Sequence, residues 1–304
     1  MHRCLGVAMA LVLAGAPGVA QQLGHKVMGS LGLYAGTQPD AGLYVLNQFG
    51  SYGSNDIYDR YGHRIPVNLN VNAVANFAGL QATLRLGHSV YLNIAAAGPV
   101  SHVSLTSDQP EASVDEFGLG DIYVQPVEIG WKAEHMDIVG GYAFYAPTGL
   151  YIPHGSGGIG LGQWTHEFSL GGTVYFDRAK AWRFSSLASY DLNQRKEGID
   201  ITRGDTFQIQ GGAGKRFRIG KNLGTLDVGA VGYGLWQVRD DRGADLPAAL
   251  RGARDVALGL GPEADYTVAR IRSRFTVRYC QDVVAKSRPL GRILVIGIVV
   301  LARK

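Results

Sequence analysis

The sequence is poor in cysteine, and its two thiols lie far apart. Cys4 falls in an apolar run near the N-terminus, and Cys280 is the only other cysteine of the 304 residues. Residues 1–20 have the layout of a secretory signal peptide: a short basic start, an apolar run, and small residues before a cut at Gln21. We therefore expect residues 1–20 to be removed, which excludes an internal disulfide in residues 21–304.

Charge and long apolar runs are also scarce. Charged residues make up 18% of the chain and the net charge is +4, whereas about a quarter of the residues of a soluble domain are charged. With no long basic run, nothing favours nucleic acid as a partner. After residue 20 no apolar run reaches the roughly 18 residues of a transmembrane helix. A membrane location would therefore require a closed barrel, in which every backbone polar group is paired.

Glycine and tyrosine are abundant, with 43 and 15 residues, and alternation of polar and apolar residues replaces helical periodicity. In residues 67–77, VNLNVNAVANF, the apolar side chains Val67, Leu69, Val71 and Phe77 share one parity, and Asn68, Asn70, Asn72 and Asn76 share the other. A strand puts each set on its own face. The two candidate structures are a soluble sheet with one wet face and a membrane barrel with a wet lumen. In the barrel we expect the asparagines to line the lumen and the apolar residues to face lipid.

Segments of this kind recur along the chain between turn-forming clusters. We expect about twelve strands, within a range of about ten to fourteen, joined by alternately short and long connections as in bacterial outer-membrane barrels. The fold class predicted is all-β: a single transmembrane antiparallel up-and-down β-barrel over residues 21–304. A soluble β-sandwich is the alternative, but it needs neither so many strands of about ten residues nor so few charges. The expected strands are 43–49, 67–77, 81–97, 118–132, 136–151, 164–177, 181–193, 204–217, 224–238, 256–268, 270–279 and 290–302.

Several motifs in a fixed order resemble an outer-membrane transporter family named for the meta-pathway of phenol degradation. They are GLGDIYVQPVEIGW, GGYAFYAPTGLY, GQW followed by Thr165-His166-Glu167, ASYDLN, ITRGDTFQIQGGAGKRF and VGAVGYGLWQVRDDRG. The resemblance covers about residues 115 to 245. It implies a β-barrel transporter encoded near genes of aromatic degradation, and it supplies no catalytic residues.

The C-terminal strand departs from that family pattern. Such barrels usually end in an aromatic residue that the barrel-assembly machinery recognises, but this chain ends GRILVIGIVVLARK, with Lys304 last. Residues 293–301 are apolar at both parities. Either another element covers the lumen-facing side of this strand, or the C-terminus is aberrant.

Arginine follows strand alternation in RIRSRFTVRY, residues 270–279. Facing lipid, each arginine would cost roughly 2–4 kcal/mol near the midplane, so we expect them to line the lumen. The same argument places two polar residues of segment 181–193 inside. Two interpretations stay open: salt bridges with lumen carboxylates, or a ladder that attracts anions such as aromatic carboxylates. The predicted lumen-lining residues from these two segments are Arg183, Asp191, Arg270, Arg272, Arg274 and Arg278.

Weaker motifs suggest chemistry but lack its context. Residues 155–160 match GxGxxG, yet no helix pattern follows. His154 and Ser156 lack the elbow and the orienting acid of a hydrolase. Asp240, Asp241 and Asp245 could hold calcium, although an oxygen-rich turn is the simpler interpretation. We therefore predict no catalytic residue, no cofactor and no metal.

The function expected from the sequence is that of an outer-membrane channel of a Gram-negative bacterium, passing small hydrophobic or aromatic compounds without catalysis. Its expected partners are outer-membrane lipid, those solutes and the barrel-assembly machinery. A closed structural barrel and a barrel esterase are the alternatives. The sequence does not decide whether the glycine-rich loop at residues 152–163 plugs the lumen.

Overall fold

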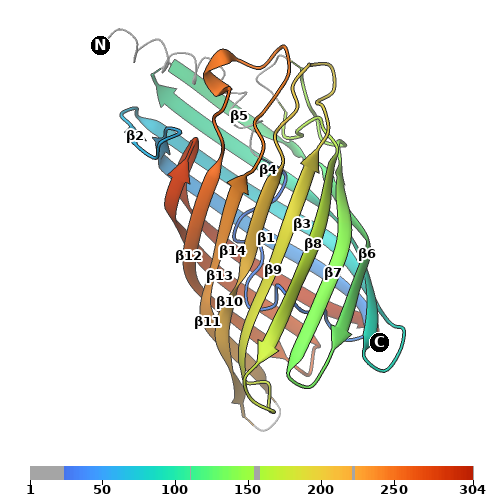
Figure 1. Cartoon of the computed structure of the whole chain (residues 1–304). Coiled ribbons are helices and arrows are strands. Elements are labelled where there is room, and N and C mark those ends of the chain that lie inside the picture. Colours follow the sequence, from blue (N-terminus) through green and yellow to red (C-terminus); the bar gives the residue numbers. More distant parts are fainter. Residues whose placement is uncertain (1–23, 110, 154–157, 221–222, 304) are drawn as a thin grey trace.

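A computed structural model describes residues 24–109, 111–153, 158–220 and 223–303. The predicted signal peptide and its cut, His154 and Ser156 lie outside these residues. Twelve antiparallel strands form a closed ring in chain order, and the last strand pairs with the first (Figure 1). The ring strands are β1 Gly42–Tyr58, β3 Leu69–Arg85, β4 Val90–Asp108, β6 Ile122–Lys132, β7 Met136–Ala146, β8 Thr165–Tyr175, β9 Trp182–Asn193, β10 Thr206–Ile219, β11 Gly224–Gln237, β12 Val256–Val268, β13 Ser273–Lys286 and β14 Arg288–Arg303.

Three short elements lie outside the ring. β2 (Arg64–Ile65) pairs with the end of β1, and β5 (Glu111–Leu119) pairs with the end of β4. A single 3₁₀ turn, η1 (Ala248–Leu250), lies in the connection between β11 and β12. Among the described residues, no helix is long and apolar enough to cross a membrane.

The strands alternate between an apolar outer face and a polar inner face. In β9, Trp182 and Phe184 are exposed on the outside, whereas Arg183, Ser185 and Asp191 are buried inside. Exposed aromatic rings also lie close to the ends of strands, as expected where a barrel meets the two membrane–water interfaces. Trp131, Trp182 and Phe217 are near the short turns, and Trp164 is near the long connections.

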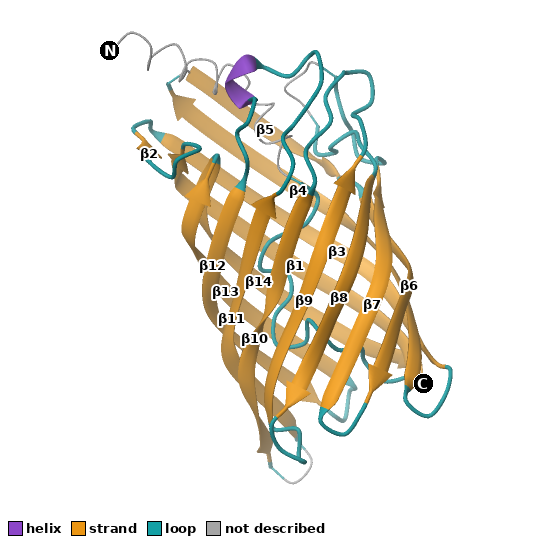
Figure 2. Cartoon of the chain, viewed as in Figure 1, coloured by secondary structure: helices purple, strands orange, loops and turns teal. Residues whose placement is uncertain are grey.

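The short turns after β3, β6, β8, β10 and β12 lie at one end of the barrel (Figure 2). The connections at the other end are longer, except that Ser287 alone joins β13 to β14. β1 begins and β14 ends at the short-turn end. In outer-membrane barrels the short turns are periplasmic and the longer loops extracellular, and we name the two ends accordingly.

The predicted count of twelve ring strands is confirmed, although some predicted boundaries are wrong. Ala78 and Gly79, which lie between the expected strands 67–77 and 81–97, do not form a turn, because β3 continues through them to Arg85. Residues 104–113 lie outside the expected strands, between 81–97 and 118–132, but contain the end of β4 and the start of β5, which pair with each other as a hairpin.

The prediction that the asparagines line the lumen is wrong. Leu69 and Val71 are buried, at 4% and 9% exposure, whereas Asn70 and Asn72 are exposed on the outer face. Asn68 is exposed as well, and Asn76 is half-buried on the outer parity of the strand, bonded to Asn47 of β1. Parity therefore separates the two faces correctly but was assigned to the wrong sides.

The physical reason is that this part of the barrel wall extends beyond the apolar band. β1, β3 and β4 have 17, 17 and 19 residues, whereas β7 and β8 have 11 each. The additional six to eight residues add about 20–25 Å of strand at roughly 3.3 Å per residue. Along this extension the outer face is polar, and the inner face is closed by an apolar cluster of Ile57, Val67, Leu69, Val71 and Leu105.

Candidate functional site: a lumen occupied by the N-terminal segment

Residues 24–41, which precede β1, run through the inside of the barrel; we name them the luminal segment. Its upper end contacts Asp121 and Thr165 near the extracellular end of the wall. Its lower end contacts Glu128 and Lys132 near the periplasmic turn after β6. Figure 2 shows its trace between the front and back walls. The segment therefore spans the lumen and occupies it.

Two side chains hold the upper end. The ring of His25 shares hydrogen bonds with Asp121 Oδ2 at 2.8 Å and Thr165 Oγ1 at 2.9 Å. The same ring stacks on Tyr145, with centroids 4.7 Å apart. Lys26 Nζ donates to both carboxylate oxygens of Glu167 at 2.7 Å. The Lys26–Glu167 pair is almost fully shielded, at 10% and 3% side-chain exposure.

The middle of the luminal segment has no strand partner, so side chains of the wall accept its backbone N–H groups. Leu31 N donates to Gln210 Oε1 at 3.2 Å, and Leu33 N donates to Glu263 Oε1 at 3.1 Å. Further down, Gly36 N donates to Ser185 Oγ at 2.8 Å. A buried N–H without an acceptor costs about as much as a lost hydrogen bond. The polar inner wall therefore makes an irregular segment tolerable inside the barrel.

One apolar side chain fixes the position of the segment. Leu33 is fully buried, with 0% exposure. Its methyl groups lie against the backbones of Gly214 and Gly229, where a Cβ would come within 2.9 and 2.7 Å of Leu33. The two glycines, on β10 and β11, thus form a socket that a larger residue would fill.

The apolar cluster around Leu33 also explains the unusual C-terminal strand. Ile293 and Val295 of β14 point inward and are buried with Met28 and Leu33 of the luminal segment. Of the two alternatives for residues 293–301, the structure shows the first: another element covers the lumen-facing side.

Tyr34 occupies a site bounded by charges. Its hydroxyl donates to Asp227 Oδ2 and accepts from Arg216 Nη2, each at 2.9 Å. Arg183 and Arg274 lie over its ring at 4.8 and 4.1 Å from the centroid. Cations over an aromatic face are attracted by its quadrupole. Arg183 and Arg274 therefore bind Tyr34 and keep the luminal segment against the wall.

Of the three predicted arginines that face inward, Arg183 and Arg278 are paired with carboxylates. Arg183 Nη2 lies 2.6 Å from Asp227 Oδ1, and Arg278 Nε bonds to Glu263. Arg274 faces inward at half burial and contacts Tyr34. The geometry matches the salt-bridge interpretation for Arg183 and Arg278 more closely than a ladder of unpaired cations.

The predictions for Arg270 and Arg272 are wrong. Both are exposed in the periplasmic turn between β12 and β13, where Arg272 has a φ of 52°. β13 begins at Ser273, three residues later than the parity argument assumed. Only residues inside the strand keep the alternation, so the argument failed where the turn begins.

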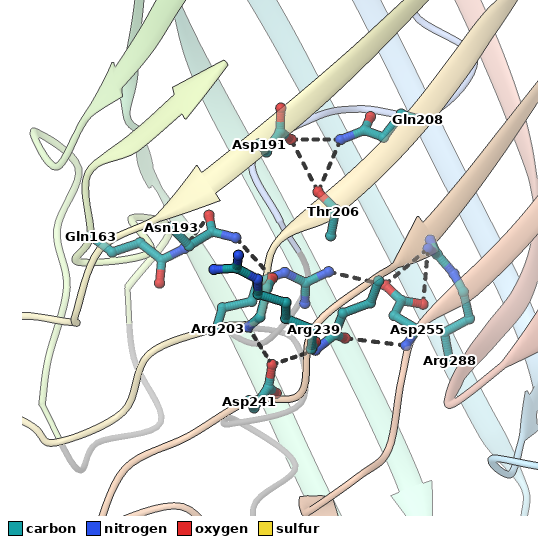
Figure 3. Close-up of polar contacts among 12 residues, drawn as sticks. Gln163, Asp191, Asn193, Arg203, Thr206, Gln208, Arg239, Asp241, Asp255 and Arg288 are labelled. Atoms are coloured by element: carbon teal, nitrogen blue, oxygen red, sulfur yellow. Dashed lines mark hydrogen bonds and ion pairs between the residues drawn. The ribbon is translucent and has the colours of Figure 1, made fainter. Parts of the chain in front are cut away.

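Asp191 lies inside the barrel at 1% exposure and accepts hydrogen bonds from Gln208 Nε2 at 2.5 Å and Thr206 Oγ1 at 3.3 Å (Figure 3). It stands directly opposite Glu167 in the β8–β9 register. Close to the extracellular end, Asp255 accepts from Arg203 and Arg288 at 3.2 Å (Figure 3). The inner wall is therefore a network of buried ionic and amide groups.

Burial shifts the pKa of groups at the extracellular end of the barrel. Lys196 lies buried in the β9–β10 connection, and burial lowers its pKa to about 8. Burial also lowers the pKa of His25, although the carboxylate of Asp121 acts in the opposite direction. For Asp121, burial raises the pKa, but hydrogen bonds from His25 and from the N–H groups of Leu161 and Gly149 outweigh it and lower the pKa. At neutral pH, His25 is thus neutral and Asp121 ionised.

The three loop aspartates considered for calcium, Asp240, Asp241 and Asp245, have other partners. Asp240 pairs with Arg254, and Asp241 accepts from Gly204 N and Gln237 Nε2. Asp245 accepts from the backbone of Asp200. Within the described ranges, no group of three or more acidic, histidine or cysteine residues is placed to hold a metal.

The luminal segment was not predicted. It carries no alternation, and its functional residues, His25, Lys26 and Leu33, form no motif. One signal existed: an apolar inner parity in residues 293–301 required a covering element. The described part of the glycine-rich loop is not that element, because Gly160 and Leu161 bond to Leu150 and Asp121 at the extracellular end.

A closed twelve-stranded antiparallel barrel with an apolar outer face, a polar inner wall and aromatic girdles defines an outer-membrane β-barrel protein. The sequence also matches, over residues 54–294, the family described as the MetA-pathway of phenol degradation, and the chain belongs to that family.

Solved structures agree on the fold. An outer membrane channel from Pseudomonas putida F1 is similar with a TM-score of 0.74 and 12% identity, over 91% of this chain and 99% of that one. The β domain of the Bordetella autotransporter BrkA is similar with a TM-score of 0.54 and 12% identity, over 86% of this chain and all of that one. No curated protein matches the sequence.

Proposed function

We propose that the protein is a channel for passive passage of small hydrophobic or aromatic compounds across the outer membrane, without catalysis. The observation that carries this proposal is that the barrel encloses a separate segment of chain. A lumen that holds residues 24–41 would, with that segment displaced, be wide enough for a solute of aromatic size. The family and the likeness to an outer membrane channel support the same function.

The inner wall beside the luminal segment suits such solutes. Tyr145 stacks on His25 and also contacts the ring of Tyr123, at 5.0 Å between centroids. Tyr233 packs in the apolar cluster with Met28 and directs its hydroxyl to Asp282. Tyrosine offers an apolar face with a polar tip, so a path along these rings would accept flat molecules that carry few polar groups.

The experiment is solute uptake into liposomes that contain the purified barrel. We expect faster entry of aromatic acids and phenols than of sugars of equal mass, and a larger rate when Leu33→Ala loosens the luminal segment. Leu80→Ala, on the lipid-facing side at 56% exposure, is the matched control.

The second candidate is a closed structural barrel, which the buried network around the luminal segment favours. In that case neither the wild-type protein nor Leu33→Ala would admit any solute or conduct in planar bilayers, and the channel proposal would fail.

A further inference from the structure

The outward asparagines belong neither to the lumen nor to the lipid-facing band. We propose that the outer face of β3, β4 and β5, above that band, is a binding surface for the sugar units of lipopolysaccharide. We name this face the asparagine face: Asn68, Asn70 and Asn72 before and in β3, Thr106 and Asp108 in β4, and Ser113 and Asp115 in β5. All seven side chains are exposed.

The position of the asparagine face follows from the strands that carry it. On the outer parity of β3, Leu84 and Leu80 are exposed apolar residues, and the same row then changes to Asn72 and Asn70. On β4, Ile94 and Val100 are followed by exposed His102 and Thr106. Figure 1 shows β4 and β5 rising beyond the upper ends of β8 to β11. The polar face therefore begins where the acyl chains end, which in the outer leaflet is the level of the saccharide.

The chemistry of the face fits sugar hydroxyls. Its groups are amides, hydroxyls and carboxylates, which together both donate and accept hydrogen bonds, as hydroxyls do. None of the seven residues is lysine or arginine, and the neighbouring imidazole of His102 is bonded to Asp115, with Nε2 2.6 Å from Oδ1. The face therefore offers phosphate no lysine or arginine side chain. Phe117, on the same outer parity of β5, is 75% exposed. Its ring offers an apolar platform at the lower edge of the face for the C–H side of a sugar.

The face is also held in one shape. Asn72 Nδ2 donates to Asn70 Oδ1 at 2.5 Å, and Asn68 Nδ2 donates to Asp108 Oδ2 at 2.5 Å. Val71 of β3, Leu105 of β4 and Val114 of β5 are neighbours across the three strands. Their side chains pack in or against the apolar cluster of the extension. A surface ordered before binding loses little side-chain entropy on binding.

A protein partner fits the face less well. The centre of a protein interface is usually depleted in charge and enriched in aromatic and apolar residues. The asparagine face instead carries two carboxylates among its seven side chains, exposed Glu111 lies in the same row of β5, and Phe117 lies at the edge of the face. Continuity with the lipid-facing band therefore favours the saccharide.

The test uses the purified full barrel in detergent and core oligosaccharide released from lipid A. We expect the oligosaccharide to bind the wild-type barrel, and the Asn68/Asn70/Asn72→Ala variant to bind at least tenfold more weakly. Phe117→Ala should weaken binding several-fold. Glu197→Ala, an exposed change in the β9–β10 connection, is the control that should bind as the wild type does. Heat-modifiable gel mobility verifies that each variant is folded.

Each alternative gives its own result. Equal binding of the wild type and the triple variant would overturn the proposal. So would tighter binding to lipid A without core than to the oligosaccharide, which would indicate the phosphates. Loss of binding in EDTA would show bridging by divalent cations instead of direct contact. A dimer that only the triple variant dissolves would identify a second copy of the chain as the occupant.

Discussion

Replacing Leu33 with alanine should loosen the luminal segment without unfolding the barrel. Leu33 has 0% exposure and fills the socket at Gly214 and Gly229. A buried Leu→Ala change costs about 2–5 kcal/mol, depending on how far the site collapses. If that loss falls on docking of the segment, the population of the open state rises by a factor of roughly 30 to several thousand.

The chain carries its own reporter for this opening. Cys280 is 1% exposed and packs in the apolar cluster under the luminal segment. A water-soluble thiol reagent should reach it only when the segment leaves, so the labelling rate follows the open population when closing is fast. We expect Leu33→Ala to raise this rate at least tenfold. Leu80→Ala removes the same atoms from the lipid-facing side and should leave the rate unchanged.

An unchanged rate in a folded Leu33→Ala barrel would refute the argument that packing at this socket holds the segment. Fast labelling in the wild type would refute the burial of Cys280 itself.

Three further predictions use the same thiol assay. Lys26→Met should accelerate labelling, because it leaves Glu167 as a buried unpaired charge at a cost of about 3–5 kcal/mol. Adding Glu167→Gln should restore much of the lost docking free energy. A double variant that is labelled as fast as the Lys26→Met variant would contradict this. Acidification should also weaken docking: the lowered pKa of His25 means that the displaced segment binds the proton more readily, so docking weakens as pH falls below about 6.5. The measure is the labelling rate divided by that of a free thiol at the same pH, because the reacting thiolate becomes scarcer as pH falls. The lowered pKa of Asp121 adds a further loss below about pH 4. A corrected rate that is flat from about pH 8 to 4 would reject the His25 effect, and one that is flat from about pH 4 to 3 would reject the Asp121 effect. Gly36→Ala should displace the lower half of the segment and accelerate labelling, because a Cβ there would meet a backbone carbonyl of β8. Gly50 has open space around the position of a Cβ, so Gly50→Ala should leave the labelling rate unchanged.

The sequence predicted the barrel because alternation is a property of each strand alone. Trp182 to Asn193 shows it clearly, and Arg183 and Asp191 lie inside as their parity required. Parity does not say which face is inward, and near Asn70 the usual rule of polar inside reverses, because the strand has left the membrane. The reversal near Asn70 follows from the unequal lengths of the strands. Those lengths depend on the pairing of β3 with β4 along their full length.

The luminal segment could not be predicted from local pattern. Its stability comes from contacts distant in the sequence, such as Gly29 with Arg278, which are 249 positions apart. The apolar inner face of β14 showed that a covering element was needed, but nothing in residues 24–41 identified them as that element.

The luminal segment joins directly to β1, and β1 closes the ring against β14. The first described residues of the chain therefore rest on its last strand, through Met28 and Leu33 against Ile293 and Val295. Contacts of such high sequence separation form late and slowly, because a long loop must close before they contribute. Once the ring has closed, its continuous hydrogen-bonded wall leaves only the two ends as routes for a segment to enter. The segment must then be threaded from an end, whereas before closure it could be laid in sideways. Placement of residues 24–41 is therefore geometrically simplest before β1 and β14 meet.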